Sequence, residues 1–197
     1  AIIGGGIFGC LTAIALADKE FDVVLIELMD DVLKGATKNN FNRVHYGYHY
    51  PRDLETALQS RNGFDNFVNT FSRCLSRGFP NYYFVADELS KTSPEQYLDF
   101  CRKAGLGCET VTSADIELEV RKCTLGVKAN EVVYDHDVLR SQIKQAIQNR
   151  KNIRVECNAG VVYIRQPDSG FKLDLSSGIY VESHAVVNSS YANINMF

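Results

Sequence analysis

The sequence predicts an α/β fold in which a Rossmann-like domain carries an inserted, partly antiparallel α+β portion. Two observations lead to this prediction. The chain begins with an apolar strand, a glycine-rich turn, a helix-like run and a second apolar strand, which is the order of a βαβ unit. Its last third is rich in short runs of β-forming residues, so strands are expected to return after an intervening segment.

The glycine-rich turn follows the first strand and fits the pattern G-x-G-x-x-G. Gly4 permits the tight turn, Gly6 lets a pyrophosphate approach the backbone, and Gly9 lets the helix pack closely on the strand. The helix that begins at Ile7 and Phe8 offers N–H groups and the positive end of its dipole to phosphate. These five residues are therefore predicted to bind a dinucleotide. The alternative is a glycine-rich turn that binds nothing.

The second strand, residues 22–27, ends in an acidic residue. Glu27 lies 23 positions after Gly4, the spacing at which a carboxylate accepts hydrogen bonds from the adenosine ribose. An acid at this position favours an unphosphorylated ribose, and hence FAD or NAD over NADP. The fingerprint by itself is compatible with either.

Helical patterns or flanking residues support five predicted helices. Apolar or small residues recur at helical spacing in the first two. Ser93, Pro94 and Gln96 provide an N-cap, a first-turn proline and a capping box for the third, and Asp137 is the expected N-cap of the fifth. The predicted helices span residues 7–18, 52–74, 93–104, 113–120 and 137–149.

Aromatic, β-branched and apolar runs predict the strands. Residues 29–42 are polar and without periodicity, so they are expected to form a long loop. The turn Asp168-Ser169-Gly170 between two apolar runs predicts a hairpin. The predicted strands lie in residues 1–3, 22–27, 82–86, 125–133, 153–157, 160–165, 171–175, 179–181 and 185–187.

These elements suggest two intermixed domains. We assign residues 1–78 and 135–197 to a discontinuous nucleotide-binding domain and residues 79–134 to part of a substrate or cap domain. The chain begins inside a strand and ends just as another strand delivers its C-terminal loop, so we expect it to be a fragment of a longer protein.

Composition narrows the partners and the compartment. The formal net charge of −3 leaves no basic footprint for nucleic acid. No apolar run approaches the ~20 residues that cross a bilayer. The six scattered cysteines include no C-x-x-C pair, which argues against a zinc site and a disulfide scaffold and favours a reducing, cytoplasmic location. The expected partner is a small-molecule substrate.

The stretch from Gly35 to Pro51 is dense in hydrogen-bonding groups, histidines and tyrosines. With the opening fingerprint and Glu27, its Gly35-Ala36-Thr37 turn and Arg43-Val44-His45-Tyr46-Gly47 run resemble FAD-dependent oxidoreductases of the D-amino-acid oxidase (DAO-type) superfamily. The H-x-G-x-x-Y pattern at His45, Gly47 and Tyr50 looks most like the L-2-hydroxyglutarate oxidase branch. The resemblance implies a glutathione-reductase-type FAD-binding domain.

The resemblance also implies roles for individual residues. Thr37 would lie near the pyrophosphate or the sugar-like chain of the flavin, and the Arg43–Gly47 run along the isoalloxazine ring. Val161 would pair its backbone with adenine. Ser189 and Ser190 would border the pyrophosphate, although Tyr191 stands where many relatives carry glycine. That departure puts the contact near Ser190 in doubt.

The run from Arg43 to Tyr50 also makes chemical sense by itself. Gly47 would let a flat ring approach the backbone, Arg43 would stabilise negative charge on a reduced flavin, and His45 could accept a substrate proton as hydride leaves. His45 and Arg43 are thus the predicted catalytic residues. An extended chain would place His45, Gly47 and His49 on one face, opposite the tyrosines. The alternative is an aromatic strand whose histidines have only structural partners.

Further alternatives concern metal, flavin attachment and acidic residues. His45 and His49 would ligate a metal together only on a helix, so no metal site is predicted. A covalent flavin link at His45 is a further alternative. Glu131 is predicted to be a solvated residue at the end of a strand, and Asp135 is predicted to be the N-cap of the next helix. His136 and His184 have no evident partners in the sequence and are expected to be structural.

The function predicted is that of an FAD-dependent oxidoreductase. It would transfer a hydride from the carbon of a small amine, such as an amino acid, or a 2-hydroxy acid to the flavin. Two alternatives stay open. The chain could belong to an NAD-binding dehydrogenase, or it could be a truncated, non-catalytic dinucleotide-binding domain.

Overall fold

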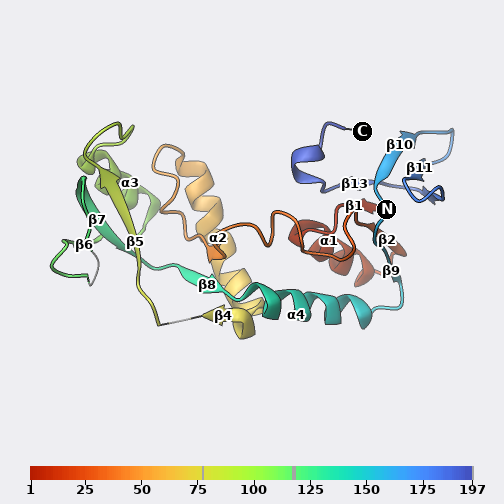
Figure 1. Cartoon of the computed structure of the whole chain (residues 1–197), viewed down its shortest axis with the longest axis horizontal. Helices are drawn as coiled ribbons and strands as arrows, with labels where there is room; N and C mark the ends of the chain where they lie inside the picture. Colours follow the sequence, from red (N-terminus) through yellow and green to blue (C-terminus); the bar gives the residue numbers. More distant parts are fainter. Residues whose placement is uncertain (77, 117–118, 197) are drawn as a thin grey trace. The chain divides into compact units, whose positions relative to one another are not determined.

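The computed structural model describes residues 1–76, 78–116 and 119–196. The chain forms two compact units (Figure 1): unit 1 comprises Ala1–Phe41 and His136–Phe197, and unit 2 comprises Asn42–Asp135. The sequence placed residues 42–78 in the nucleotide-binding domain, but the structure packs them within unit 2. The division into functional domains stays a prediction.

Strand pairing explains this difference. In unit 2, β3 (Arg43–Val44) and β4 (Leu75–Ser76) both pair antiparallel with β8 (Val132–Tyr134). The two strands of this segment, β3 and β4, therefore share a sheet with the end of the predicted insertion. Such long-range pairing is not encoded in the local pattern of either segment.

Unit 1 is built on a four-stranded parallel sheet with the order β13-β1-β2-β9. The central strands β1 (Ile2–Ile3) and β2 (Val23–Ile26) consist of apolar residues, as expected for strands covered on both faces. β9 (Ile153–Glu156) and β13 (Val187–Asn188) form the edges. The predicted parallel α/β sheet is confirmed.

Two helices pack in unit 1. α1 (Ile7–Ala17) buries Gly9, Cys10, Ala13 and Ala17, a stripe of small residues that lets it approach the sheet closely. It contacts β1, β2 and α4 (His136–Gln148). Because α4 begins at His136, Asp137 lies in its first turn, so the expected N-cap at Asp137 is wrong by position.

An antiparallel sheet completes unit 1. β10 (Val161–Arg165), β11 (Phe171–Leu175) and β12 (Tyr180–Ser183) follow one another as hairpins. The hairpin predicted at Asp168–Gly170 is therefore confirmed, and Gly170 supplies the positive φ, 83°, that its turn needs. Side chains of this sheet and of the parallel one, with Ala159 from the connection between β9 and β10, form a common core of Ile3, Ile26, Ala159, Leu173, Leu175 and Val181.

Unit 2 contains a second antiparallel sheet with the order β5-β7-β6. Its strands are β5 (Asn81–Ala86), β7 (Cys123–Ala129) and β6 (Glu109–Val111). α3 (Pro94–Ala104) packs on it through Tyr97, Phe100 and Cys101, around the buried side chains of Tyr48 and Val127. α3 has the predicted capping box: Ser93 Oγ accepts from the Gln96 N–H, and Gln96 Oε1 accepts from the Ser93 N–H.

Two predicted helices differ in the structure. The helix predicted over residues 52–74 is α2 (Leu54–Thr70) followed by a 3-10 turn, η1 (Ser72–Cys74). α2 begins after Asp53, whose side chain accepts from the Thr56 N–H. The helix predicted over residues 113–120 is wrong in its first half, where residues 113–116 form turns, and residues 117–118 lie outside the described part of the chain.

Several smaller features bear on the expectations above. Within the described residues, no helix has the length and apolarity to span a bilayer, and no cluster of three or more His, Cys, Asp or Glu side chains has metal-binding geometry. All six cysteines are free thiols. His136 is buried, and its Nε2 lies 2.9 Å from the Leu33 carbonyl oxygen.

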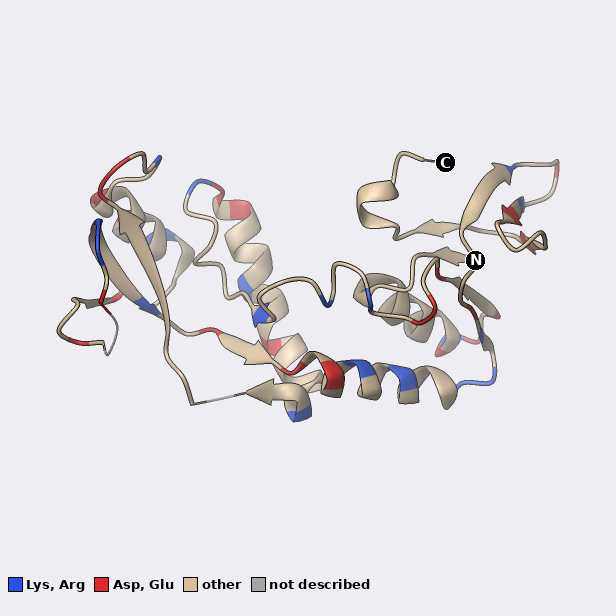
Figure 2. Ribbon diagram, in the orientation of Figure 1, with Lys and Arg blue, Asp and Glu red and all other residues tan. Residues whose placement is uncertain are grey.

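An ion-pair cluster ties α4 to the loop after β2 within unit 1. The Asp31 carboxylate pairs with Arg140, and its Oδ2 lies 2.6 Å from Lys144 Nζ. Figure 2 shows basic positions in blue along the ribbon of α4. Partial burial acts to raise the pKa of Asp31, but hydrogen bonds from Lys144 and the Val32 N–H and the charge of Arg140 outweigh it, so this pKa is lowered.

Replacing Asp31 with asparagine is therefore expected to lower stability at neutral pH. A carboxyl whose pKa is lower in the folded state stabilises the fold above its unfolded pKa, about 3.9, and loses that contribution as the pH falls through the folded value. The difference between Asp31→Asn and the parent protein in denaturant unfolding should shrink as the pH falls below about 4. A difference that stayed constant with pH would contradict this account.

A candidate dinucleotide site in unit 1 and a buried carboxylate cluster in unit 2

The glycine-rich turn between β1 and α1 leaves no space for side chains at two of its glycines. Gly4 has a φ of +101°, and a Cβ there would lie 2.6 Å from the Ser189 carbonyl oxygen. A Cβ on Gly9 would lie 1.9 Å from the Gly4 carbonyl oxygen. The positive φ of Gly4 and the close contact at Gly9 agree with the turn and packing roles predicted for these two glycines.

Gly6 differs from those two glycines. A Cβ there would meet only Thr37 Oγ1 within 4 Å, at 3.6 Å. Gly6 is the N-cap of α1 and has no side chain of its own to cap the helix, and the first helical bond runs from the Cys10 N–H to the Gly6 carbonyl oxygen. The amides of Phe8 and Gly9 thus precede the hydrogen-bond ladder, as in a helix N-terminus that binds phosphate. This helix start, with glycine at its N-cap, fits a pyrophosphate.

Thr37 lies at the same helix N-terminus. Its Oγ1 accepts a hydrogen bond from the Ile7 N–H at 3.1 Å. This contact ties the turn of residues 35–38 to the start of α1, so the structure brings Thr37 to the glycine-rich turn of unit 1. The predicted contact between Thr37 and the cofactor stays a prediction.

Glu27 faces the glycine-rich turn from the end of β2. Its Oε2 accepts from the Gly5 N–H at 2.6 Å, and its Oε1 accepts from the Met29 N–H at 2.8 Å. Both bonds orient the carboxylate, and each oxygen keeps a further lone pair that a ribose hydroxyl can use. The geometry is therefore compatible with the predicted role of Glu27.

The chain returns to this region before β10. The Ala159 N–H donates to the Glu27 carbonyl oxygen at 3.0 Å, and the Asn158 N–H donates to the Met29 carbonyl oxygen at 2.8 Å. Ala159 is therefore held at the end of β2, which carries Glu27. Val161, the first residue of β10, follows Ala159 by two residues. Val161 is thus brought near the predicted adenosine position, and its pairing with adenine stays a prediction.

The end of β13 forms the other side of the turn. The Ser189 N–H donates to the Ile3 carbonyl oxygen at 2.8 Å, and its own carbonyl covers Gly4. The Ser190 hydroxyl donates to Asn188 Oδ1 at 2.6 Å. Ser189 and Ser190 therefore lie beside the fingerprint, as the resemblance implied. Their contact with the pyrophosphate is a prediction still.

Tyr191, the residue that departs from the glycine of many relatives, has a φ of 54° and an exposed side chain. A left-handed backbone is strained for a non-glycine residue. We expect Tyr191→Gly to raise the free energy of unfolding by ~0.5–1 kcal/mol, measured by denaturant titration. Tyr191→Ala keeps a Cβ and hence the strain, so it should give no gain. An equal gain from both variants would point to the tyrosine ring instead.

The segment after β3 in unit 2 differs from its prediction. The extended chain expected to alternate histidines and tyrosines is wrong, because residues 47–49 turn. Gly47 has a φ of +116°, and a Cβ there would lie 2.8 Å from the Ala57 carbonyl oxygen. His45 and His49 stack at 5.3 Å, and the Tyr50 ring lies edge-on to both. Close approach of α2 thus accounts for Gly47 within unit 2.

Glu131 is the centre of a polar cluster in unit 2. Its side chain is 0% exposed, so its description as a solvated strand end is wrong. Oε1 accepts from the Tyr46 N–H at 2.9 Å, and Oε2 accepts from the Tyr83 hydroxyl at 2.9 Å. The Asn81 side-chain amide donates to the Glu131 carbonyl oxygen at 2.9 Å. β3, β5 and the turn before β8 together bury this carboxylate.

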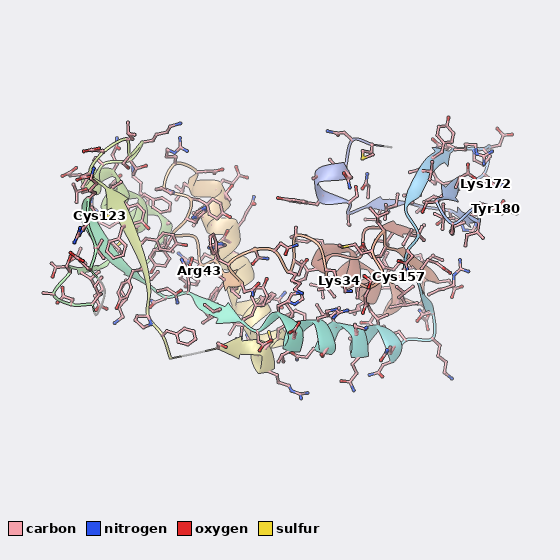
Figure 3. The ribbon with its side chains drawn as sticks, viewed as in Figure 1. Lys34, Arg43, Cys123, Cys157, Lys172 and Tyr180 are labelled. Atoms are coloured by element: carbon pink, nitrogen blue, oxygen red, sulfur yellow. The ribbon has the colours of Figure 1, made fainter. Side chains whose placement is uncertain are left out.

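The two predicted catalytic residues lie in this cluster. Arg43 Nη1 is 3.6 Å from Glu131 Oε2, and the Arg43 guanidinium lies 5.4 Å from the centre of the Tyr83 ring. Figure 3 labels Arg43 in unit 2. His45 Nδ1 is 3.3 Å from the Tyr83 oxygen and 3.5 Å from Glu131 Oε1. Burial and the nearby Glu131 carboxylate raise the pKa of Tyr83, which keeps its hydroxyl protonated.

One feature of the sequence, the position of Glu131, indicates this cluster. Glu131 follows an apolar strand and directly precedes the apolar run Val132-Val133-Tyr134. An acid between two buried strands is a candidate for a paired buried charge. Tyr83 gave no such sign, because an aromatic residue in a strand is most often explained by packing.

The fold and the glycine-rich turn define an α/β protein with a dinucleotide-binding βαβ unit. A family profile described as "FAD dependent oxidoreductase" (DAO) matches residues 1–196. The chain belongs to this family. The match confirms the predicted superfamily, the fold class and FAD as the cofactor, and the L-2-hydroxyglutarate oxidase branch stays a prediction.

Individual relatives agree with this assignment. The chain is 40% identical over 106 residues to FAD-dependent monooxygenase FPY4 of Fusarium mangiferae, covering 53% of this chain and 28% of that protein. It is 27% identical to FAD-dependent monooxygenase kojA of Aspergillus flavus, over 98% of this chain and 46% of that protein. The chain thus spans less than half the length of these curated relatives.

A solved structure shares the fold. Glycine oxidase from Geobacillus kaustophilus superposes with a TM-score of 0.73 at 19% identity, covering 98% of this chain and 55% of that one. At this identity the likeness concerns the fold alone.

Proposed function

We propose that the protein containing this chain is an FAD-dependent oxidoreductase that removes a hydride from the carbon of a small amine, such as an amino acid, or a 2-hydroxy acid. The observation that supports this chemistry best is the group formed by His45, Arg43 and Tyr83 around the buried Glu131 carboxylate. A histidine with an oriented ring is suited to accept a proton, and a fixed cation is suited to bind or stabilise negative charge.

The cofactor residues proposed in unit 1 are those of the glycine-rich turn and its neighbours. Gly4, Gly6, Ile7, Phe8 and Gly9 hold the pyrophosphate, Glu27 holds the ribose, and the remaining contacts come from Thr37, Val161, Ser189 and Ser190. The flavin supplies the acceptor for the hydride. Gly47 and His45 are proposed to adjoin the flavin ring, as the resemblance implies.

In the proposed reaction His45 accepts the proton of the substrate hydroxyl or amine while hydride leaves the carbon. Arg43 provides positive charge for a substrate carboxylate or for the electrons gained by the cofactor. Glu131 keeps both side chains in place through its contacts with Arg43, Tyr83 and the backbone of Tyr46.

A second candidate, a monooxygenase, is supported by the names of the two fungal relatives. The two functions differ in the electron donor. A substrate oxidase or dehydrogenase reduces its own flavin from the substrate, whereas a flavin monooxygenase commonly takes electrons from a nicotinamide. Membership of the FAD-dependent oxidoreductase family disfavours an NAD-binding dehydrogenase. The alternative of a truncated, non-catalytic domain stays a prediction. The cytoplasmic location stays a prediction as well.

Anaerobic bleaching separates these functions. The intact, purified protein should absorb near the flavin band at ~450 nm. We expect a panel of amino acids and 2-hydroxy acids to contain a compound that bleaches this band without nicotinamide. Bleaching only by NADH or NADPH would favour the monooxygenase, and a colourless protein that FAD cannot reconstitute would refute both.

Replacement of His45 tests its role as the base. His45→Gln is expected to lower the rate of bleaching by ~10²–10⁴-fold, the usual contribution of a general base. FAD affinity, measured by quenching of flavin fluorescence, should change little. His184→Gln, a replacement in unit 1, serves as the control. If bleaching kept its full rate in His45→Gln, the proton would have to leave by another route.

A further inference from the structure

The hydrogen-bond network around Glu131 fixes the direction in which protons point. The Tyr46 N–H donates to Oε1, and Arg43 lies beside Oε2, so the carboxylate is surrounded by a donor and a cation. An ionised carboxylate only accepts hydrogen bonds. The bond between Tyr83 and Glu131 Oε2, at 2.9 Å, must therefore carry the tyrosine hydrogen.

His45 is the next member of the network. Its Nδ1 lies 3.3 Å from the Tyr83 oxygen, whose single hydrogen is already directed at Glu131. The Tyr83 oxygen can then only accept from His45. The other oxygen near Nδ1 is Glu131 Oε1 at 3.5 Å, which is also an acceptor. Both neighbours of Nδ1 thus require a donor.

From this geometry we infer that Glu131 and Tyr83 are positioning residues that hold neutral His45 in its Nδ1–H tautomer, leaving the lone pair of Nε2 to accept the substrate proton. This inference deepens the proposed function and, as far as catalysis is concerned, rests on it. The tautomer itself does not, because it follows from contacts within unit 2.

Other groups near the ring are consistent with the assignment. The ring centre of His49 lies 5.3 Å from that of His45 in a stacked arrangement, and the ring centre of Tyr50 lies 6.3 Å away in an edge-on arrangement. These are ring contacts, so neither residue replaces the hydrogen-bond partners of His45 Nδ1. The raised pKa of Tyr83, caused by its burial and then by Glu131, keeps the bridging hydrogen on the tyrosine. The His45 side chain is 37% exposed, so part of the ring faces solvent.

Nitrogen NMR of the histidine rings tests the tautomer directly. The intact protein, labelled with ¹⁵N-histidine, is measured at ~pH 9, where imidazoles are neutral, and the His45 signals are identified by their loss in His45→Gln. We expect Nδ1 to show the shift of a protonated nitrogen and Nε2 that of an unprotonated one. The opposite pattern in the parent protein would overturn the inference.

A near-isosteric variant tests the cause. In Glu131→Gln the new amide can donate to the Tyr83 oxygen, which frees the tyrosine hydrogen to point at His45 Nδ1. The tautomer should then reverse to Nε2–H. Glu109→Gln, at an exposed acid of the same unit, should leave it unchanged. An unchanged His45 tautomer in Glu131→Gln would overturn the role of Glu131. If that variant did not fold, Tyr83→Phe would test the same network and should lose the strict Nδ1–H preference.

Kinetics link the tautomer to catalysis. Glu131→Gln should lower kcat at least tenfold with little change in KM and in FAD affinity, because it presents the wrong ring nitrogen to the substrate. Absence of bleaching in the parent protein would reject the proposed function while leaving the NMR assignment intact. An inverted tautomer with an unchanged kcat would reject the catalytic part of this inference alone.

Discussion

Replacing Gly6 with alanine is expected to weaken FAD binding by about tenfold or more, equivalent to ~1.4 kcal/mol, while leaving the fold nearly unchanged. The added Cβ would meet only Thr37 Oγ1, at an ordinary 3.6 Å. It would, however, occupy the side of the turn where the pyrophosphate approaches the first amides of α1. The free energy of unfolding of the apoprotein should fall by less than about 1 kcal/mol.

The matched variant Gly9→Ala should lower stability as well as binding. Its Cβ would lie 1.9 Å from the Gly4 carbonyl oxygen, so β1 and α1 would have to separate. Overpacking of this kind costs ~3 kcal/mol. Denaturant unfolding of the apoprotein and fluorescence titration with FAD distinguish the two variants.

The opposite ranking would contradict this interpretation. If Gly6→Ala bound FAD as tightly as the parent protein, the open side of the turn would not be the pyrophosphate position. If Gly9→Ala were as stable as the parent protein, close packing of α1 on β1 would not be the reason for glycine there.

Replacing Glu131 with alanine is expected to lower the free energy of unfolding by ~3 kcal/mol. This is the lower end of the effect seen when one partner of a buried ion pair is removed. The loss leaves the Tyr83 hydroxyl and the Tyr46 N–H without their acceptor and removes the counter-charge of Arg43. Each buried donor left unsatisfied costs ~1–3 kcal/mol. Because Arg43 is partly exposed, solvent reduces its share of the effect.

Thermal or denaturant unfolding checks this expectation. Glu109→Ala is the matched control, since Glu109 is exposed and pairs with Lys128 at the surface, where an ion pair contributes ~0–1 kcal/mol. A second variant, Glu131→Leu combined with Tyr83→Phe, removes acceptor and donor together and should recover part of the loss. Equal effects of Glu131→Ala and Glu109→Ala would contradict the buried network.

Local patterns in the sequence predicted the parts of the fold whose cause is local. The capping box of α3 and the contact between Gly9 and the Gly4 carbonyl depend on neighbours a few residues away. The G-x-G-x-x-G turn and the acid after β2 are recognised from their fixed spacing in the sequence. The hairpin at Asp168–Gly170 follows from the same kind of information. These elements were therefore predicted with small errors at their ends.

Long-range contacts were not available from these patterns. The sequence around Glu131 predicts a solvated side chain. Only the pairing of β3, β4 and β8 buries it, beside Tyr46 and Arg43, which lie 85 and 88 positions earlier in the chain. The turn at Gly47 follows from the approach of the Ala57 carbonyl on α2, which local alternation of histidine and tyrosine does not reveal.

The amino-acid sequence by itself thus determined the dinucleotide-binding βαβ unit and the class of cofactor, because glycines, a helix start and a terminal acid at fixed spacing create the phosphate site locally. Only the tertiary structure decided which groups surround His45. A buried carboxylate acquires its partners through strands distant in sequence, and the cost of burying a charge without partners makes that arrangement specific.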